Sequence, residues 1–312
     1  MDSQNFEILG HLLQIIRQNI EGNKNYEIDR LLLNQINQLD ISAQNIFWHD
    51  IAMYYMKLNS DKYIKCLENI QKNNDRGYSN AQHILGQKYL KKKELDKAIQ
   101  ALNEISKDYC DIYLNSRIDL GRALEERRQD EQAIKVYIEI LKITTKSDEE
   151  YAKAQLNLSS LYFNKKMYSQ AEKALKKISG KFKSIYADSQ FGLALIASKR
   201  KNDQTAVDYY EKVSKEQNAQ TYAKSKFNQG NSYLRLGNTG LAIESFNQVP
   251  VEFIELYEMA QNNLISIYRN QFKISEILET FTNIRKESKV YALLRYSITV
   301  LKKVENSAHK EL

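Results

Sequence analysis

The chain has 312 residues, with a single proline and only ten glycines. Because Leu, Ile, Ala, Lys, Glu, Gln and Asn dominate, the composition favours long helices and leaves few tight turns, which predicts an all-α fold. The 46 Lys and Arg exceed the 39 Asp and Glu by a formal +7. The two signs are interspersed along the chain, which indicates a solvated mixed-charge surface and disfavours nucleic acid as a partner.

The cysteines and the N-terminal residues indicate the cellular location of the protein. Cys66 and Cys110 lie far apart and have no CxxC or Cys/His spacing, so the sequence predicts neither a disulfide framework nor a zinc site. Residues 1–22 carry charges among their apolar positions and lack the basic start and unbroken apolar core of a signal peptide. No stretch approaches the roughly 18 apolar residues that a membrane span needs. We therefore expect a cytoplasmic protein with no membrane segment.

In chain order, residues 1–42 are expected to form an N-terminal helical cap. Their apolar runs at 12–13, 15–16 and 31–33 suit two helices, joined by the polar segment 21–25.

From residue 43 to residue 286 the sequence repeats itself in seven units. Residues 61–70 align with residues 96–105 at an offset of 35. One position in the first helix of each unit reads Ile51, Gly86, Gly121, Ser159, Ala194, Gly230 and Ile265. The steps between them are 35, 35, 38, 35, 36 and 35 residues. The long step places three extra residues in the polar run 144–150, which we interpret as a tolerated surface insertion in preference to a hinge or a processed site.

Large side chains recur at one position in the second helix of each unit, whereas the first-helix position is small in five of the seven units. They are Leu67, Leu102, Tyr137, Leu175, Tyr210, Phe246 and Phe281. A Gly or Ala lets two helix backbones approach while a large side chain from the other helix fills the adjacent hole. The alternation therefore predicts antiparallel helix pairs.

The last segment, residues 287–312, is expected to form a C-terminal capping helix. Its apolar residues recur at amphipathic helical spacing. They are Val290, Leu293, Leu294, Ile298, Leu301 and Val304.

The repeat resembles the tetratricopeptide repeat, whose pattern places Leu-Gly-x-x-Tyr in one helix and Ala-x-x-x-Phe in the next within about 34 residues. The segment from Leu85 to Tyr89, followed by Ala98 and Leu102, is the closest copy. The resemblance covers residues 43–286. It implies a right-handed superhelical solenoid of antiparallel helix pairs, with seven repeats between the two caps.

No motif indicates catalysis or a cofactor. The sequence lacks GxGxxG, Walker, HExxH and GxSxG patterns and holds only four His. We therefore predict that the protein is not an enzyme and uses no cofactor. His49 and His83 fall at inward-facing positions of consecutive units, with Asp119 in the next one. Because they lack metal-ligand spacing of their own, we favour groove-lining polar side chains over a metal site.

The resemblance implies that the first helix of each unit lines a concave groove. One groove position reads His49, Ile84, Asp119, Asn157, Gly192, Asn228 and Asn263. With Asn231, one turn beyond Asn228, the asparagines form a partial ladder. A carboxamide can donate to and accept from the backbone of an extended peptide, although chance placement in an Asn-rich chain is the alternative. Lys153, Lys224 and Arg122 would add positive charge to this face.

The neighbouring position reads Trp48, His83, Ile118, Leu156, Phe191, Phe227 and Asn262. Relatives that grip a C-terminal carboxylate require Lys here, so a receptor for such tails is disfavoured. Trp48, Phe191 and Phe227 are candidate apolar anchors for a peptide or a partner helix, with packing between repeats as the competing interpretation.

The predicted function is a protein-protein interaction scaffold or adaptor that binds an extended peptide or partner helix in the concave groove. Two alternatives stay open. One is an RNA-binding helical repeat of the pentatricopeptide kind, to which residues 262–268 are similar. The other is a peptide-sensing regulatory module of a larger assembly. The sequence does not predict the partner or the oligomeric state.

Overall fold

The computed structural model describes residues 3–22, 28, 30–58, 60–73, 75–271, 273–286, 291, 295 and 299. All regular structure among these residues is helical, which confirms the predicted all-α class. The chain divides into two compact units, Met1–Thr145 (unit 1) and Lys146–Leu312 (unit 2). The division falls inside the polar run 144–150, where the sequence repeat has its three extra residues.

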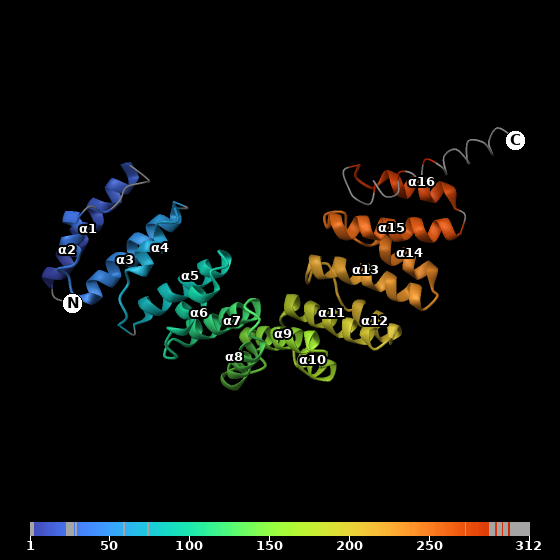
Figure 1. Ribbon diagram of the computed structural model, residues 1–312, viewed down its shortest axis with the longest axis horizontal. Helices are drawn as coiled ribbons and strands as arrows, with labels where there is room; N and C mark the ends of the chain where they lie inside the picture. Colours follow the sequence, from blue (N-terminus) through green and yellow to red (C-terminus); the bar gives the residue numbers. More distant parts are fainter. Residues whose placement is uncertain are drawn as a thin grey trace. The chain divides into compact units, whose positions relative to one another are not determined.

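Unit 1 is a series of helices in which, from the third helix onward, each helix packs on the next one along the chain (Figure 1). Its helices are α1 (Ser3–Gly22), α2 (Arg30–Ile36), α3 (Ile41–Lys57), α4 (Tyr63–Glu68), α5 (Arg76–Lys91), α6 (Leu95–Asn103), α7 (Cys110–Glu126) and α8 (Asp130–Ile143). The helices α3/α4, α5/α6 and α7/α8 form the predicted pairs, whose first and second members we call helix A and helix B. The two helices expected within residues 1–42 are α1 and α2, and α1 packs against α3.

Unit 2 continues the same pairing. Its helices are α9 (Glu149–Asn164), α10 (Tyr168–Leu175), α11 (Lys183–Lys199), α12 (Asp203–Tyr210), α13 (Ala219–Arg235), α14 (Thr239–Asn247), α15 (Ile254–Asn270) and α16 (Ile274–Thr282). Consecutive pairs stack because each helix A contacts the next helix A as well as its own helix B. The capping helix expected over residues 287–312 lies outside the described residues, apart from positions 291, 295 and 299. The predicted boundaries at 42/43 and 286/287 stay predictions.

The turn from helix A to helix B has one geometry throughout. The amide that follows the turn donates to the carbonyl five residues earlier, as from Glu94 to Tyr89 at 2.9 Å and from Asn238 to Tyr233 at 2.8 Å. This bond is the mark of a Schellman motif, which needs a residue in the left-handed region. Gly237 occupies that region with φ 76°. Basic residues with φ of 61–62° occupy it elsewhere; they are Lys93, Arg128, Lys166 and Lys201.

Close approach between helix A and helix B explains the alternation of small and large residues. A Cβ added at Gly230 would lie 2.6 Å from the ring of Phe246, and one added at Gly121 would overlap the ring of Tyr137. Phe246 and Tyr137 are both fully buried. The hydroxyl of Tyr137 also donates to Glu125, so its ring is held in place. The predicted packing of large residues against small ones is confirmed at these positions.

Replacing Gly121 by Ala should destabilise unit 1. The added methyl group forces the Tyr137 ring or the helix to shift, and overpacking of this kind costs about 1–3 kcal/mol. The matched control is Gly10→Ala in α1, where a Cβ meets nothing within 4 Å. That change should raise the free energy of unfolding by about 0.5–1 kcal/mol, because Ala loses less backbone entropy than Gly. Urea unfolding of the full chain measures both, and equal effects of the two variants would contradict the packing account.

Candidate functional site

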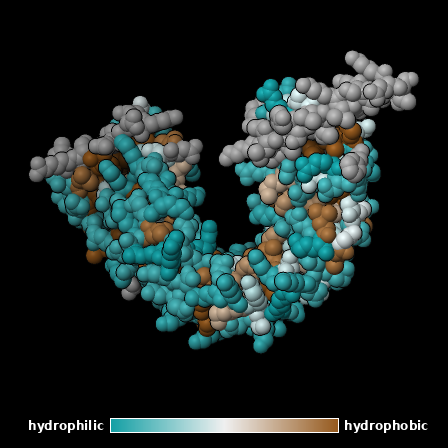
Figure 2. Space-filling model, turned by 45° about the vertical axis from the view of Figure 1, so that its right-hand side comes forward, coloured by the Kyte–Doolittle hydropathy of each residue, from teal (hydrophilic) through white to brown (hydrophobic). Residues whose placement is uncertain are grey.

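A pocket of about 420 Å³ lies on the helix A side of unit 2. Its lining comes from α9, α11 and the start of α13, which contact one another in sequence, and from Leu175 of α10. On the face shown in Figure 2, hydrophilic residues cover most of the surface and hydrophobic ones form separate patches.

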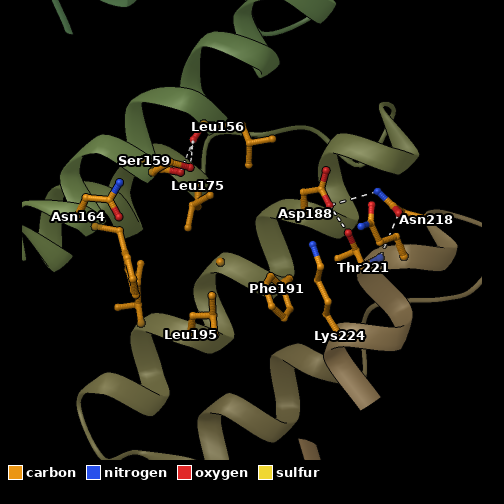
Figure 3. Close-up of a pocket in the computed structure, with 15 residues that line it drawn as sticks. Leu156, Ser159, Asn164, Leu175, Asp188, Phe191, Leu195, Asn218, Thr221 and Lys224 are labelled. Atoms are coloured by element: carbon orange, nitrogen blue, oxygen red, sulfur yellow. Dashed lines mark hydrogen bonds between the residues drawn. The ribbon is translucent and has the colours of Figure 1, made fainter. Parts of the chain in front are cut away.

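One side of the pocket is apolar. Leu156, Phe191 and Leu195, which recur on successive helices A, are half-buried and line it (Figure 3). The ring of Phe191 also packs against Tyr210, with ring centroids 5.9 Å apart. Gly192 also lines the pocket and lies close to Leu175, since a Cβ added there would be 2.9 Å from Leu175 Cδ1. The pocket can therefore accept an apolar side chain without displacing any residue.

The other side of the pocket is polar and is organised by Asp188 (Figure 3). Asn218 donates to Asp188 Oδ1 at 3.2 Å, and the hydroxyl of Thr221 donates to the same oxygen. Asn218 also caps α13, because its side-chain oxygen accepts from the amide of Thr221 at 3.1 Å. These bonds join the start of α13 to α11 and fix the orientation of the carboxylate.

Lys224 brings a positive charge to the same side. Its side chain runs between Phe191 and Thr221 toward the pocket (Figure 3). The predicted residues Phe191 and Lys224 are therefore brought together in one site. Lys153, which holds the equivalent position in α9, pairs instead with Glu149 of its own helix at 2.9 Å.

The predicted asparagine ladder lies outside the pocket lining. Asn263 of α15 donates to the side-chain oxygen of Asn231 in α13 at 3.1 Å, so these two carboxamides form a pair across adjacent repeats. Asn228 donates to the backbone carbonyl of Lys224 at 2.9 Å. Asn157 is half-buried in α9. The structure thus joins part of the ladder, and its contact with a ligand stays a prediction.

The other two predicted aromatic anchors, Trp48 and Phe227, are packed against neighbouring rings. Trp48 is only 7% exposed and contacts Phe47 edge-on at 5.2 Å. Phe227 is half-buried and packs against Phe246, with ring centroids 5.9 Å apart. Both therefore contribute to packing between helices, whereas Phe191 packs and also lines the pocket.

Unit 1 holds a polar network on its helices A, which includes three of the predicted groove residues. His83 Nε2 lies 3.1 Å from Asp119 Oδ2, and Gln87 donates to the same oxygen at 2.9 Å. Arg122 lies 3.5 Å from the second carboxylate oxygen. His49 is not part of this network, since its ring lies 3.5 Å from the Asn80 carboxamide.

Asp119 is the centre of the unit 1 network. Burial would raise the pKa of its carboxyl, but the hydrogen bonds with His83 and Gln87 and the charge of Arg122 outweigh burial and hold that pKa below its usual value. The network joins α5 to α7 by polar contacts. Within the described ranges, no group of three or more His, Cys, Asp or Glu could hold a metal ion.

Comparison with known proteins agrees with the pairing and the register. Residues 152–178 and 223–249 match the tetratricopeptide repeat family. The chain contains tetratricopeptide repeats. The matched segments run from helix A into helix B of the repeats built by α9/α10 and α13/α14, and two of the three helices A that line the pocket belong to them. No curated protein matches the chain significantly in sequence.

Two solved structures share the fold at low sequence identity. PilF of Pseudomonas aeruginosa is 14% identical with a TM-score of 0.51, over 70% of this chain and 97% of that chain. A tetratricopeptide repeat protein from Parabacteroides merdae is 13% identical with a TM-score of 0.50, over 72% and 87% of the two chains. These likenesses extend the repeat fold over more of the chain than the two matched segments.

Three polar residues of the pocket, Asp188, Asn218 and Thr221, are not among the residues predicted from the sequence. Asp188 holds the same repeat position as Lys153 and Lys224, which are predicted for their positive charge. The repeat position itself is therefore the signal that points to Asp188. Asn218 and Thr221 carry the spacing of a helix N-cap, which by itself does not indicate a site.

Replacing Asp119 by Asn should lower the free energy of unfolding near pH 7 by about 1–3 kcal/mol, because His83, Gln87 and Arg122 lose a charged acceptor. The pKa of Asp119 is lowered in the folded protein, so its carboxylate stabilises the fold above the unfolded value of about 3.9. That contribution is lost as the pH falls through the folded value. Urea unfolding between pH 7 and pH 3 should show the two proteins converging below about pH 4; a constant difference would contradict this.

Proposed function

We propose that this protein is a non-catalytic scaffold whose unit 2 binds an extended segment of a protein partner, with the 420 Å³ pocket as the anchor site. Proteins built from tetratricopeptide repeats are generally protein-interaction scaffolds. The observation that carries the proposal is a preformed pocket on the helices A, with apolar and polar sides. In the described part of the chain, no helix is long and apolar enough to cross a membrane. The cytoplasmic location stays a prediction.

The two sides of the pocket suit the two parts of a peptide. An apolar side chain of the ligand can contact Leu156, Phe191 and Leu195. The neighbouring backbone amide can donate to Asp188, and the carbonyl can accept from Lys224. Because a peptide backbone offers both groups at every residue, this pairing fixes the position of a chain without requiring a charged ligand.

The asparagines extend the same surface toward the C-terminal end of unit 2. Asn228 and Asn231 lie on α13, the helix that also carries Lys224, and Asn263 lies on the adjacent α15. The contact between Asn263 and Asn231 uses one N–H of Asn263 and the side-chain oxygen of Asn231. Each carboxamide has two N–H donors and one acceptor oxygen, so the oxygen of Asn263 and the two N–H groups of Asn231 are not used in this contact. We propose that the remaining groups bind the ligand backbone beyond the pocket.

Two single substitutions test the pocket as the binding site. Ser160 is exposed at its edge, and Ser160→Trp should fill the space without removing any packing contact. Lys224→Glu reverses the charge that faces the ligand carbonyl. Peptides selected against the full chain from a displayed random library should bind each variant at least about tenfold more weakly, a difference of about 1.4 kcal/mol. Fluorescence anisotropy measures the affinities.

The matched control is Lys212→Glu, an exposed lysine just beyond α12 that does not line the pocket. It makes the same charge change as Lys224→Glu and should leave the affinity unchanged. Circular dichroism should show equal helicity in all four proteins. If the selected peptides bind both pocket variants as tightly as the wild type, the groove of unit 2 is not the binding site.

A further inference from the structure

The positive charge of the chain is concentrated in unit 2. Of the 46 Lys and Arg, 20 fall in residues 1–145 and 26 in residues 146–312, whereas the 39 Asp and Glu divide as 21 and 18. Unit 1 therefore has a formal charge of −1 and unit 2 of +8. The segment 165–201 alone holds ten basic residues and two acidic ones. This asymmetry sets α10 and the turns beside it apart from the mixed-charge surface that the whole sequence predicts.

The basic residues of this segment meet at one edge of unit 2. The turn between α9 and α10 carries Lys166, and the turn between α11 and α12 begins beside Lys199 and carries Lys201. Arg200 joins the second of these turns to α10, since it donates to Glu172 at 2.6 Å and to Ser169 at 3.4 Å, both in that helix. All three lysines are exposed, and none has an ion-pair partner among the described residues. We call Lys166, Lys199 and Lys201 the turn-edge lysines.

The corresponding positions of unit 1 show what these lysines lack. Lys93 is the equivalent of Lys166 in the repeat, and Glu126 is the equivalent of Lys199. Lys93 and Glu126 form an ion pair at 2.7 Å between neighbouring repeats. In unit 2 the same two repeat positions carry Lys166 and Lys199, so this ion pair cannot form there. Exposed positive charges without a partner in the chain can attract an acidic ligand.

The acidic side chains beside this edge are already engaged. Asp203, two residues beyond Lys201, pairs with Arg235 at 2.6 Å. Glu172 pairs with Lys176 at 2.6 Å as well as with Arg200. Those contacts hold the pKa of Glu172 below its usual value. The chain therefore supplies no free carboxylate to the turn-edge lysines within the described residues of this segment.

We propose that the turn-edge lysines bind an acidic segment of a protein partner, as a second contact surface separate from the pocket. Single-stranded nucleic acid binders combine basic grooves with exposed aromatic rings. Here Phe163 and Tyr168, which flank the turn that carries Lys166, are half-buried and pack on each other with ring centroids 5.4 Å apart. The edge offers charge without a stacking surface, which favours carboxylates over bases.

The experiment measures binding of a fluorescein-labelled (Glu-Glu-Gly)₄ peptide and of a twelve-nucleotide oligo(dT) to the full chain by anisotropy. Wild type should bind the peptide in about 50 mM salt and release it in about 300 mM, since screening weakens exposed charges. Lys199→Glu restores the charge arrangement of the Lys93 pair, so it should weaken binding about tenfold while keeping or raising the Tm. The double substitution Lys166→Gly with Lys201→Gly should weaken binding similarly and fold normally, as Gly237 does at that position.

Lys212→Glu is the matched control and should stay within twofold of wild-type affinity. No binding of the acidic peptide by wild type would overturn the proposal, as would equal losses in Lys199→Glu and Lys212→Glu. Tighter binding of the oligonucleotide, with the same response to Lys199→Glu, would assign the edge to nucleic acid instead. Ser160→Trp should leave binding of the acidic peptide intact, so failure here is distinct from failure at the pocket.

Discussion

The close contact between helix A and helix B of each repeat is the constraint on which the rest of the structure depends. A small residue in helix A, most clearly at Gly121 and Gly230, receives a buried ring from helix B. The Schellman turn reverses the chain within a few residues, so the two helices meet in one register. Because the register is the same from repeat to repeat, the same repeat positions of every helix A face away from helix B. The proposed binding surface follows from this packing.

That register places side chains from successive helices A next to one another. In unit 2 it gathers Phe191 and Lys224 at the pocket, with Asp188 fixed by Asn218 and Thr221. In unit 1 it joins His83 to Asp119. The outcome differs between the two because the residue types differ: in unit 2 one side of the pocket is apolar, whereas in unit 1 charged and amide groups contact one another across the helices. One scaffold thus supports both the proposed binding pocket and a polar link between helices.

The sequence was sufficient for the parts of the structure that recur. The spacing of Gly86, Gly121 and Gly230 against the large residues of helix B predicted the helix pairs. The pocket could be predicted only in part. Phe191 and Lys224 were found from their repeat positions, but the hydrogen bonds of Asp188 depend on how the start of α13 meets α11. Such contacts between repeats leave no periodic signal.

Residues at the same repeat position can differ in exposure, because their packing surroundings differ. Trp48 and Phe191 hold the same position, yet Trp48 is 7% exposed whereas Phe191 is half-buried at the pocket. Neighbouring side chains, which differ from repeat to repeat, set that difference. The same holds for charge. A formal +7 spread along the sequence gave no sign that Lys166 and Lys199 stand where unit 1 has an ion pair.

Hydrogen-deuterium exchange of the full chain, with and without a peptide selected against it, tests the central claim that the helices A of unit 2 are the binding face. The account predicts slower exchange at the amides of residues 188–195 and 218–224, with little change in α12 and α14. Protection confined to the helices B, or to unit 1, would contradict it.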